Sequence, residues 1–367
     1  MLFHWLYPLV KYFTFFNLFR YITFRSVGAA VTALGISFLL GPWIVRKLES
    51  LQIKERIRPN GPQSHLVKEG TPTMGGLIVL AGVVVPTVLW TDVANRYVLL
   101  TLLATVWMGA VGFLDDYLKV VKQLPNGLIG RYKIAGQVLL GLGIGGILYF
   151  WPSDPQWATA TSMPFFKGWA LELGWLYIPM VVFVIVGTSN AVNLTDGLDG
   201  LAIGLVGIVA AALGLVAYVT GRADFSAYLG IPYLRGAGEL TVYCAALVGA
   251  SLGFLWFNAY PARVFMGDTG ALSLGGTLGT LAVLLKVELL LPVIGGVFVA
   301  EVISVILQRY YFKYTKRKAG SGRRIFRMAP LHHHFELLGW PEPKVVVRLW
   351  IVGVLLALLG LSTFKIR

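Results

Sequence analysis

The segment YVLLTLLATVWMGAVGFLDDYLKV, residues 97–120, decides the fold class. Residues 97–114 carry no charged side chain, and a membrane-spanning helix needs about 20 mostly apolar residues. The run ends in two adjacent carboxylates, Asp115 and Asp116, although a carboxylate is costly to place within a bilayer. The segment therefore predicts a membrane helix that presents two acidic side chains at one membrane surface.

The rest of the chain has the same apolar character. Of its 367 residues, 57% are hydrophobic and 13% are charged, whereas about 25% of the residues in a soluble domain are charged. We therefore predict an all-α polytopic membrane protein with about ten transmembrane helices, in which residues 1–367 form one integral membrane domain. The predicted spans are 26–45, 73–90, 97–114, 134–150, 173–190, 200–219, 240–257, 270–285, 289–309 and 345–364. Pro179, Pro292 and Gly295 lie inside these spans and predict kinks.

Two further segments have distinct compositions. Residues 1–25 are rich in aromatic side chains with a few cations between them. Since Trp and Tyr favour the membrane interface, we expect this segment to lie on the membrane surface. Residues 310–344 are basic and contain three of the five histidines, and we expect them to form a cytoplasmic loop.

The positive charges give the orientation. The loops after the first, third, fifth, seventh and ninth predicted spans hold about twice as many Lys and Arg residues as the opposite side. Cytoplasmic loops carry such an excess, so we predict that both termini face the periplasm. The net charge of +14 is then explained by these loops and by anionic lipid headgroups, and we expect no nucleic acid partner.

Five of the eight aspartates fall on the predicted cytoplasmic side: Asp115, Asp116, Asp196, Asp199 and Asp268. They come from three segments, and two of these segments contain almost no compensating cation. Turn and helix-cap chemistry explains any one of them, because Asp suits both. Taken together, a cluster of hard oxygen ligands indicates Mg²⁺, which binds one or two carboxylates and completes its shell with water and phosphate.

Nearby cations and glycines fit a phosphate-bearing ligand. Lys119 lies one turn from Asp116 if the helix continues, Lys133 opens the fourth span, and Lys68 precedes EGTPTMGG at residues 69–76. Glycines in that stretch allow close backbone approach, and Thr71 and Thr73 supply hydroxyls. The stretch matches no P-loop, and a helix N-cap explains it equally well.

The segment RIFRMAPLHHHFELLGWPEPK, residues 324–344, places His332, His333 and His334 in sequence. Consecutive residues do not share one helix face, so we do not expect all three to bind one metal ion. We expect one or two to contact a phosphate or carboxylate and the others to pack or cap. Glu301 has no partner nearby in the sequence and is expected to face the bundle interior.

The motifs FLDDYLK, NAVNLTDGLDGLA, WFNAYPARVFMGDTG and MAPLHHH resemble the polyprenyl-phosphate N-acetylhexosamine-1-phosphate transferase superfamily. Within it, the triple histidine and TPTMGG are similar to the phospho-N-acetylmuramoyl-pentapeptide transferases, and the resemblance covers essentially the whole chain. It implies a bacterial inner-membrane enzyme that uses Mg²⁺. Such an enzyme transfers phospho-MurNAc-pentapeptide from UDP-MurNAc-pentapeptide to undecaprenyl phosphate, giving lipid I and UMP, the first membrane step of peptidoglycan synthesis. The oligomeric state stays open, with a homodimer as one option.

The resemblance also implies residue roles. Asp268 would bind Mg²⁺, and Asp115 and Asp116 would orient or deprotonate the lipid phosphate. Because the second pKa of a phosphate monoester is near 6, a positioning role for Asp115 is favoured over a base. His332 is the histidine expected at the sugar-phosphate side, together with His333 and His334. Substrate contacts are expected from Lys68, Thr73, Lys119, Lys133, Asn190, Asn193, Asp196, Gly197, Asp199, Asn258 and Phe265, the last offering its ring to uracil.

Two other functions are compatible with parts of the pattern. A related transferase that uses UDP-GlcNAc would share the acidic motifs but is expected to differ around the triple histidine. A secondary transporter or cation channel would place its acids near the bilayer midplane, whereas these acids are predicted at one membrane face. Whether transfer proceeds in one step or through a covalent aspartyl intermediate is not decided by the sequence.

Overall fold

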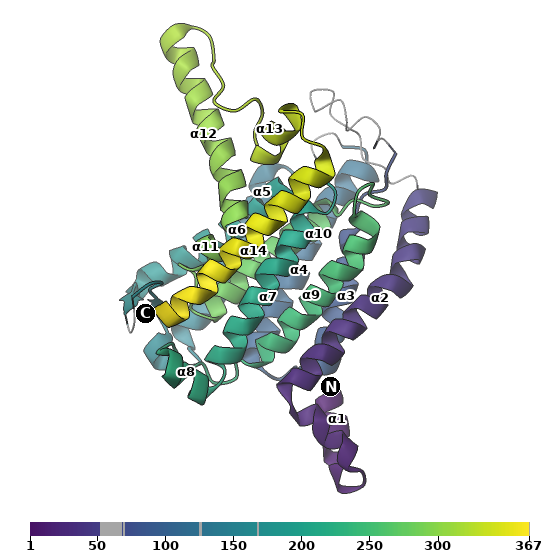
Figure 1. The fold of residues 1–367 in the computed structure, drawn as a ribbon, viewed down its shortest axis with the longest axis vertical. Helices are drawn as coiled ribbons and strands as arrows, with labels where there is room; N and C mark the ends of the chain where they lie inside the picture. The colour runs from purple at the N-terminus through teal and green to yellow at the C-terminus, as the bar shows by residue number, and fades with distance from the viewer. Residues whose placement is uncertain (52–67, 69, 125–126, 167–168, 367) are drawn as a thin grey trace.

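A bundle of long helices forms the body of the protein (Figure 1). The computed structural model describes the chain apart from residues 52–67, 69, 125–126, 167–168 and 367. A helix covers each of the ten predicted spans. These helices are α2 (Ile22–Ser50), α3 (Gly76–Trp90), α4 (Arg96–Val120), α5 (Gly130–Phe150), α6 (Tyr177–Thr195), α7 (Leu201–Thr220), α9 (Glu239–Asn258), α10 (Gly267–Leu284), α12 (Gly296–Ala319) and α14 (Glu342–Ile366).

The chain is a polytopic membrane protein by the character of these helices. Within the described ranges, seven helices are long and apolar enough to cross a bilayer, namely α2, α4, α5, α6, α7, α9 and α14. Helix α3 is apolar but has 15 residues. Helices α10 and α12 are not among the seven. Helix α10 is rich in Gly, Ser and Thr, and α12 ends in a run of basic residues.

Helix α10 forms the centre of the bundle. Every residue from Thr269 to Leu284 is buried, and the helix contacts α3, α4, α6 and α7. Its small side chains allow the neighbouring backbones to approach closely, as is common between membrane helices. One such close approach is at Gly112 of α4, where an added Cβ would lie 2.2 Å from the carbonyl oxygen of Asp268. This crossing brings the acidic end of α4 onto the first turn of α10.

The expectation of an all-α chain needs one correction. The connection between α5 and α6 contains a short antiparallel sheet of β1 (Ala160–Ser162) and β2 (Ala170–Glu172), in the register Ala160 to Glu172. A buried network attaches this hairpin to the α10–α11 connection. In it, Lys286 donates to the Tyr177 hydroxyl at 2.7 Å, Tyr177 donates to Glu288 at 3.0 Å, and Thr161 also donates to Glu288.

The predicted breaks are partly confirmed. The ninth predicted span is divided at Gly295 into α11 (Leu291–Ile294) and α12, with Pro292 in the first turn of α11. Pro179 lies in the first turn of α6 rather than in the middle of a helix. Proline is tolerated in a first turn because its missing N–H has no helical partner at that position.

Much of the segment 310–344, expected to connect two spans on the cytoplasmic side, is helical, and its cytoplasmic location stays a prediction. Helix α12 continues to Ala319 and projects beyond the bundle (Figure 1). The short α13 (Leu331–Leu337) follows, and α14 begins at Glu342. Favourable helix propensity through the Lys and Arg run explains the extension.

Short elements complete the described chain. The aromatic N-terminal segment folds into α1 (Leu2–Leu6), η1 (Tyr7–Lys11) and η2 (Thr14–Arg20), which project at the opposite end from α13 (Figure 1). Many of its rings are exposed, for example Trp5, Tyr12 and Phe13. The others are η4 (Pro155–Trp157), η5 (Gly174–Leu176) and α8 (Ala223–Leu229).

Candidate active site

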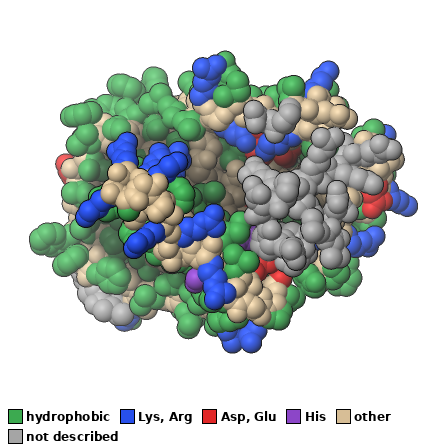
Figure 2. Space-filling model, turned by 90° about the horizontal axis from the view of Figure 1, so that it is seen from above, with side chains coloured by type: hydrophobic (Ala, Val, Ile, Leu, Met, Phe, Trp, Pro, Cys, Tyr) green, Lys and Arg blue, Asp and Glu red, His purple; other side chains and the backbone are tan. Residues whose placement is uncertain are grey.

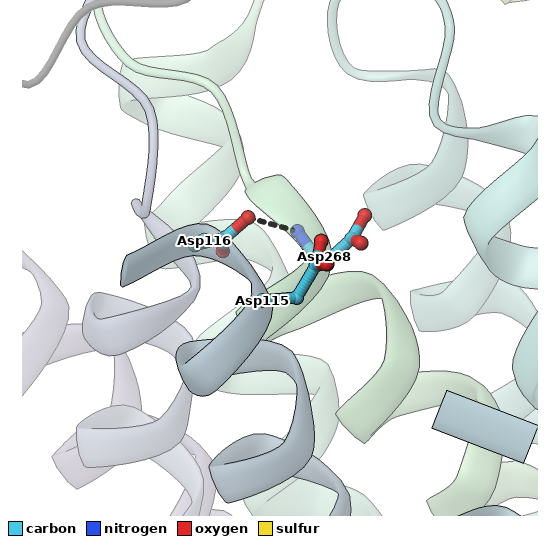
Figure 3. A group of neighbouring side chains, drawn as sticks. All are labelled: Asp115, Asp116 and Asp268. Atoms are coloured by element: carbon cyan, nitrogen blue, oxygen red, sulfur yellow. Dashed lines mark hydrogen bonds between the residues drawn. The ribbon is translucent and has the colours of Figure 1, made fainter. Parts of the chain in front are cut away.

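Three carboxylates meet where the C-terminal turns of α4 contact the first turn of α10. One oxygen from each of Asp115, Asp116 and Asp268 lies within 4.8 Å of the others. Asp115 and Asp116 are buried and Asp268 is partly buried. Figure 3 shows that the Asp115 and Asp268 side chains lie side by side, whereas the Asp116 side chain turns a carboxylate oxygen toward the backbone nitrogen of Asp268. Successive residues of a helix differ in direction by about 100°, which separates the two adjacent aspartates.

Asp116 connects the two helices. Its carboxylate accepts hydrogen bonds from the backbone N–H of Asp268 at 3.1 Å, the backbone N–H of Thr269 at 2.8 Å and the Thr269 hydroxyl at 2.6 Å (Figure 3). The first N–H groups of a helix have no helical acceptor, so Asp116 caps α10 from the neighbouring helix. The cap and the contact at Gly112 together fix α4 against α10.

Two lysines face the other two carboxylates. Lys119 forms ion pairs with Asp115 and with Asp268, the latter at 3.1 Å. Lys133 lies 2.8 Å from Asp115 and 2.5 Å from Asp268. The backbone N–H of Leu128 also donates to Asp115 at 2.7 Å. Both lysines thus pair with Asp115 and Asp268, and carboxylate oxygens beside them are the kind of ligand that Mg²⁺ binds.

A second cluster surrounds Lys68. Its ammonium group lies 2.6 Å from Asp199 and 2.6 Å from Glu342. Burial alone lowers the pKa of Lys68, but the two carboxylates outweigh it and raise the pKa above its usual range. Asp199 also accepts from the backbone N–H of Ala262 at 3.0 Å, and Glu342 accepts from the backbone N–H of Asp199 at 2.7 Å. Lys68 and Asp199 therefore join the α6–α7 turn to the α9–α10 connection and to the start of α14.

Asn258 belongs to the same support. Its side chain accepts from the backbone N–H of Gly200 at 3.0 Å and donates to the carbonyl of Val264 at 2.9 Å. It thus holds the residues that precede Phe265, whose ring is half-buried. Asn190 donates to Gln137 of α5 at 2.8 Å, while Asn193 and Asp196 are partly exposed at the end of α6.

The TPTMGG segment pairs with the α9–α10 connection through its backbone. The N–H groups of Gly75 and Gly76 donate to the carbonyls of Phe265 and Met266, each at 2.8 Å. In return, the N–H of Phe265 donates to the carbonyl of Pro72 at 2.8 Å. These N–H groups are already bonded and cannot also cradle a phosphate. Thr73 is buried beside Gly267 in the same ladder, and its expected substrate contact stays a prediction.

The three histidines have different partners, although the rings of His332 and His333 are in contact, with their centroids 4.2 Å apart. The His332 ring is fully buried. His333 lies 2.8 Å from Glu336, and His334 accepts from the backbone N–H of Arg327 at 3.1 Å. The His332 ring has no exposed surface in this structure, and its expected contact with the sugar-phosphate side stays a prediction.

The expected acidic and basic residues lie at one end of the bundle. Figure 2 shows this face, where Lys and Arg side chains are spread over the surface and carboxylates are visible between them. Sequence reasoning missed Glu342 and Gln137, because their partners are more than 50 residues away in the chain. Glu301 was expected to face the interior, and it does so.

Comparisons with known proteins agree with this site. Residues 98–286 match the Glycosyl transferase family 4 profile, and residues 68–80 match the phospho-N-acetylmuramoyl-pentapeptide-transferase signature 1. Proteins named phospho-N-acetylmuramoyl-pentapeptide-transferase are similar over the full length of both chains. The chain is 57% identical to that of Citrifermentans bemidjiense, 55% to that of Gemmatimonas aurantiaca and 52% to that of Thermodesulfovibrio yellowstonii.

Proposed function

The chain belongs to the phospho-N-acetylmuramoyl-pentapeptide-transferase family, and from this premise we propose how its site acts. The protein transfers phospho-MurNAc-pentapeptide from UDP-MurNAc-pentapeptide to undecaprenyl phosphate, which yields lipid I and UMP. One substrate is soluble and the other is anchored in the bilayer, so they meet at the membrane surface. The observation that carries the proposal is the cluster of Asp115, Asp116 and Asp268 at the ends of α4 and α10.

The cluster has the composition of a magnesium site. Asp268 is the carboxylate that would hold Mg²⁺; Asp115 lies beside it, and Asp116 is already used by the N-terminus of α10. When bound, the ion neutralises phosphate charge and stabilises the charge that develops during phosphoryl transfer. Lys119 and Lys133 supply further positive charge at the same place.

Asp115 acts as a positioning group in this proposal. Its carboxylate is bound by Lys119, Lys133 and the N–H of Leu128, so it holds both lysines beside Asp268. The lipid phosphate is already largely a dianion at pH 7 because its second pKa is near 6. Removal of a proton is therefore a minor requirement, and the site mainly has to bring two anions together.

The nucleotide side is assigned to the α6–α7 turn and the α9–α10 connection. Asp196, Asn193 and the Phe265 ring are the groups that would contact uridine, and Asn190 lies one helical turn before Asn193. Aromatic faces stack on nucleobases with a gain of about 1–3 kcal/mol. Lys68 and Asp199 support this side through the ion pair described above.

The topology follows from the same proposal. Ten spans with both termini in the periplasm place the cluster at the cytoplasmic face of the bacterial inner membrane, where a soluble nucleotide sugar can reach it. The homodimer considered from the sequence stays a prediction. A transporter is disfavoured because its acidic residues would lie near the bilayer midplane, whereas Asp115, Asp116 and Asp268 lie at helix ends.

The test is an assay of UMP release by the purified protein in detergent or nanodiscs. With undecaprenyl phosphate present, UDP-MurNAc-pentapeptide should give UMP and UDP-GlcNAc should not. Chelation of divalent cations should stop release, and added Mg²⁺ should restore it. Equal release from both nucleotide sugars would assign the chain to the related UDP-GlcNAc chemistry instead, and release unaffected by chelation would remove the metal from the proposal.

A further inference from the structure

Glu301 is a buried carboxylate that the site described above does not use. It lies on α12 with 1% of its surface exposed. Its Oε2 atom is 3.3 Å from His332 Nδ1 and accepts from the backbone N–H of His332 at 3.4 Å. Its Oε1 atom has no hydrogen-bond partner among the described residues. Since a buried carboxylate is costly unless it is paired, the position of Glu301 calls for a specific role.

The imidazole of His332 connects Glu301 to the α6–α7 turn. The ring is fully buried, with Nδ1 toward Glu301 and Nε2 toward Gly197. A Cβ at position 197 would lie 2.3 Å from Nε2 and 3.0 Å from Cε1. The ring therefore occupies the volume that any side chain at Gly197 would need, and the turn and the imidazole fix each other.

The two halves of this turn are held by different groups. Asp199 and Gly200 are bonded to Lys68, Ala262, Glu342 and Asn258 from the sides of α9 and α14. Gly197, next to Asp196, instead packs on His332. His332 is carried by α13, to which the chain returns from the far end of α12 and which lies beside the start of α14 (Figure 1). The imidazole therefore limits where Gly197 can lie.

We propose that Glu301 is a positioning residue for the nucleotide substrate. By orienting the buried imidazole of His332, it sets the position of the Asp196–Gly197 turn against which uridine binds. The inference rests on the proposed function, because it takes that turn to be the nucleotide side. It also gives the triple histidine a physical role. His332 contacts both Glu301 of α12 and Gly197 of the turn, while His333 and His334 form hydrogen bonds with Glu336 of α13 and Arg327 before it.

Glu301→Gln is the first test, because it keeps the shape of the side chain and removes its charge. The uridine contacts are remote from the reacting phosphates, and an interaction equally strong in the ground and transition states affects KM rather than kcat. We expect KM for UDP-MurNAc-pentapeptide to rise about tenfold, while kcat changes less than about threefold and KM for undecaprenyl phosphate stays unchanged. Glu301→Asp, which keeps the charge, should recover part of the loss.

Gly197→Ala provides an independent route to the same turn. It should raise the same KM, and the double variant Glu301→Gln/Gly197→Ala should be little worse than the more damaging single variant, because coupled positions are not additive. Glu288→Gln is the matched control: this carboxylate is also buried and hydrogen-bonded, but it lies in the network at the opposite end of the bundle. It should lower thermal stability without changing either KM.

UMP binding by calorimetry separates this inference from the proposed function. If the parent protein binds no UMP and releases none, the proposed function fails. If the parent binds UMP and Glu301→Gln binds it equally well, with a lower melting temperature only, then Glu301 is a structural anchor and the inference is overturned. Parallel increases of KM for both substrates would overturn it as well, and Glu301→Asp gives the same comparison if Glu301→Gln does not fold.

Discussion

Gly112→Ala should disable the site although residue 112 touches no substrate. The added Cβ would lie 2.2 Å from the carbonyl oxygen and 2.5 Å from the carbonyl carbon of Asp268. Ordinary contacts begin near 3.4 Å, so α4 and α10 must separate locally by about 1 Å. Both sides of this contact are backbone in a packed core, which cannot relax as a flexible side chain can.

The consequence for the site follows from the bonds of Asp116. They measure 2.6, 2.8 and 3.1 Å, and a separation of about 1 Å would take all three beyond hydrogen-bonding distance. Hydrogen bonds to a charged group contribute about 1.5–3 kcal/mol each, and overpacking costs about 1–3 kcal/mol. A displacement of about 1 Å in a reacting constellation lowers the rate by about 10², and we expect a loss of kcat of at least that size.

The assay is UMP release at saturating Mg²⁺ and saturating concentrations of both substrates, together with thermal unfolding. Gly143→Ala on α5 is the matched control, because nothing lies within 4 Å of a Cβ at that position. Both changes have the same intrinsic benefit to a helix, about 1 kcal/mol, so the difference between them isolates the clash. If Gly112→Ala keeps kcat within about threefold of the parent, the helix contact does not set the geometry of the carboxylates.

Four further outcomes are expected. Asp268→Asn should leave the fold intact and lower transfer by about 10²–10⁴, since an amide is a poorer Mg²⁺ ligand; near-normal turnover at ordinary Mg²⁺ would exclude Asp268 from the metal site. The activity of Asp115→Asn relative to the parent protein should stay constant from about pH 6 to about pH 8. If this ratio instead recovers as the lipid phosphate becomes a dianion near its pKa of about 6, Asp115 acts as a base. Burial lowers the pKa of Lys286 from 10.5 to about 8. Between these two pH values the unfolded chain binds a proton that the native state has released, so the free energy of unfolding should increase with pH by ~3 kcal/mol across this range. The melting temperature should therefore rise with pH in the parent protein but not in Lys286→Met. A cysteine introduced at Ser321 should be labelled from the cytoplasmic side, and labelling only from the periplasm would reverse the proposed orientation.

The helices and the side of the bundle that bears the site could be predicted from the sequence. Apolar length gave the helix ranges, because a bilayer leaves few other ways to satisfy the backbone. The alternation of the spans then placed FLDDYLK and FMGDTG at the same end, and the structure brings their aspartates together. The presence of lysines at the site could also be predicted, because Lys119 follows the two aspartates by about one helical turn, and it pairs with Asp115 in the structure.

The partners of individual polar groups could not be predicted. Glycines and threonines in TPTMGG suit a phosphate loop and a backbone ladder equally well. The ladder forms because the segment 265–267, which is distant in the sequence, supplies its hydrogen-bond partners. His332 is polar, adjacent to two other histidines and yet buried, because Glu301 and Gly197 enclose it from distant parts of the chain. The helical extension of α12 likewise depends on propensity in a segment whose charge suggested a loop.

The adjacency of Asp115 and Asp116 can now be explained by helix geometry. A single aspartate at the end of α4 could either cap α10 or face the lysines, because one side chain has one direction. Two successive aspartates point about 100° apart, so Asp116 holds the N–H groups of α10 while Asp115 organises Lys119 and Lys133 beside Asp268. The cap also fixes the backbone of Asp268 itself through its N–H. The two adjacent carboxylates therefore have separate roles: Asp116 supports the helix contact, and Asp115 orders the lysines at the site.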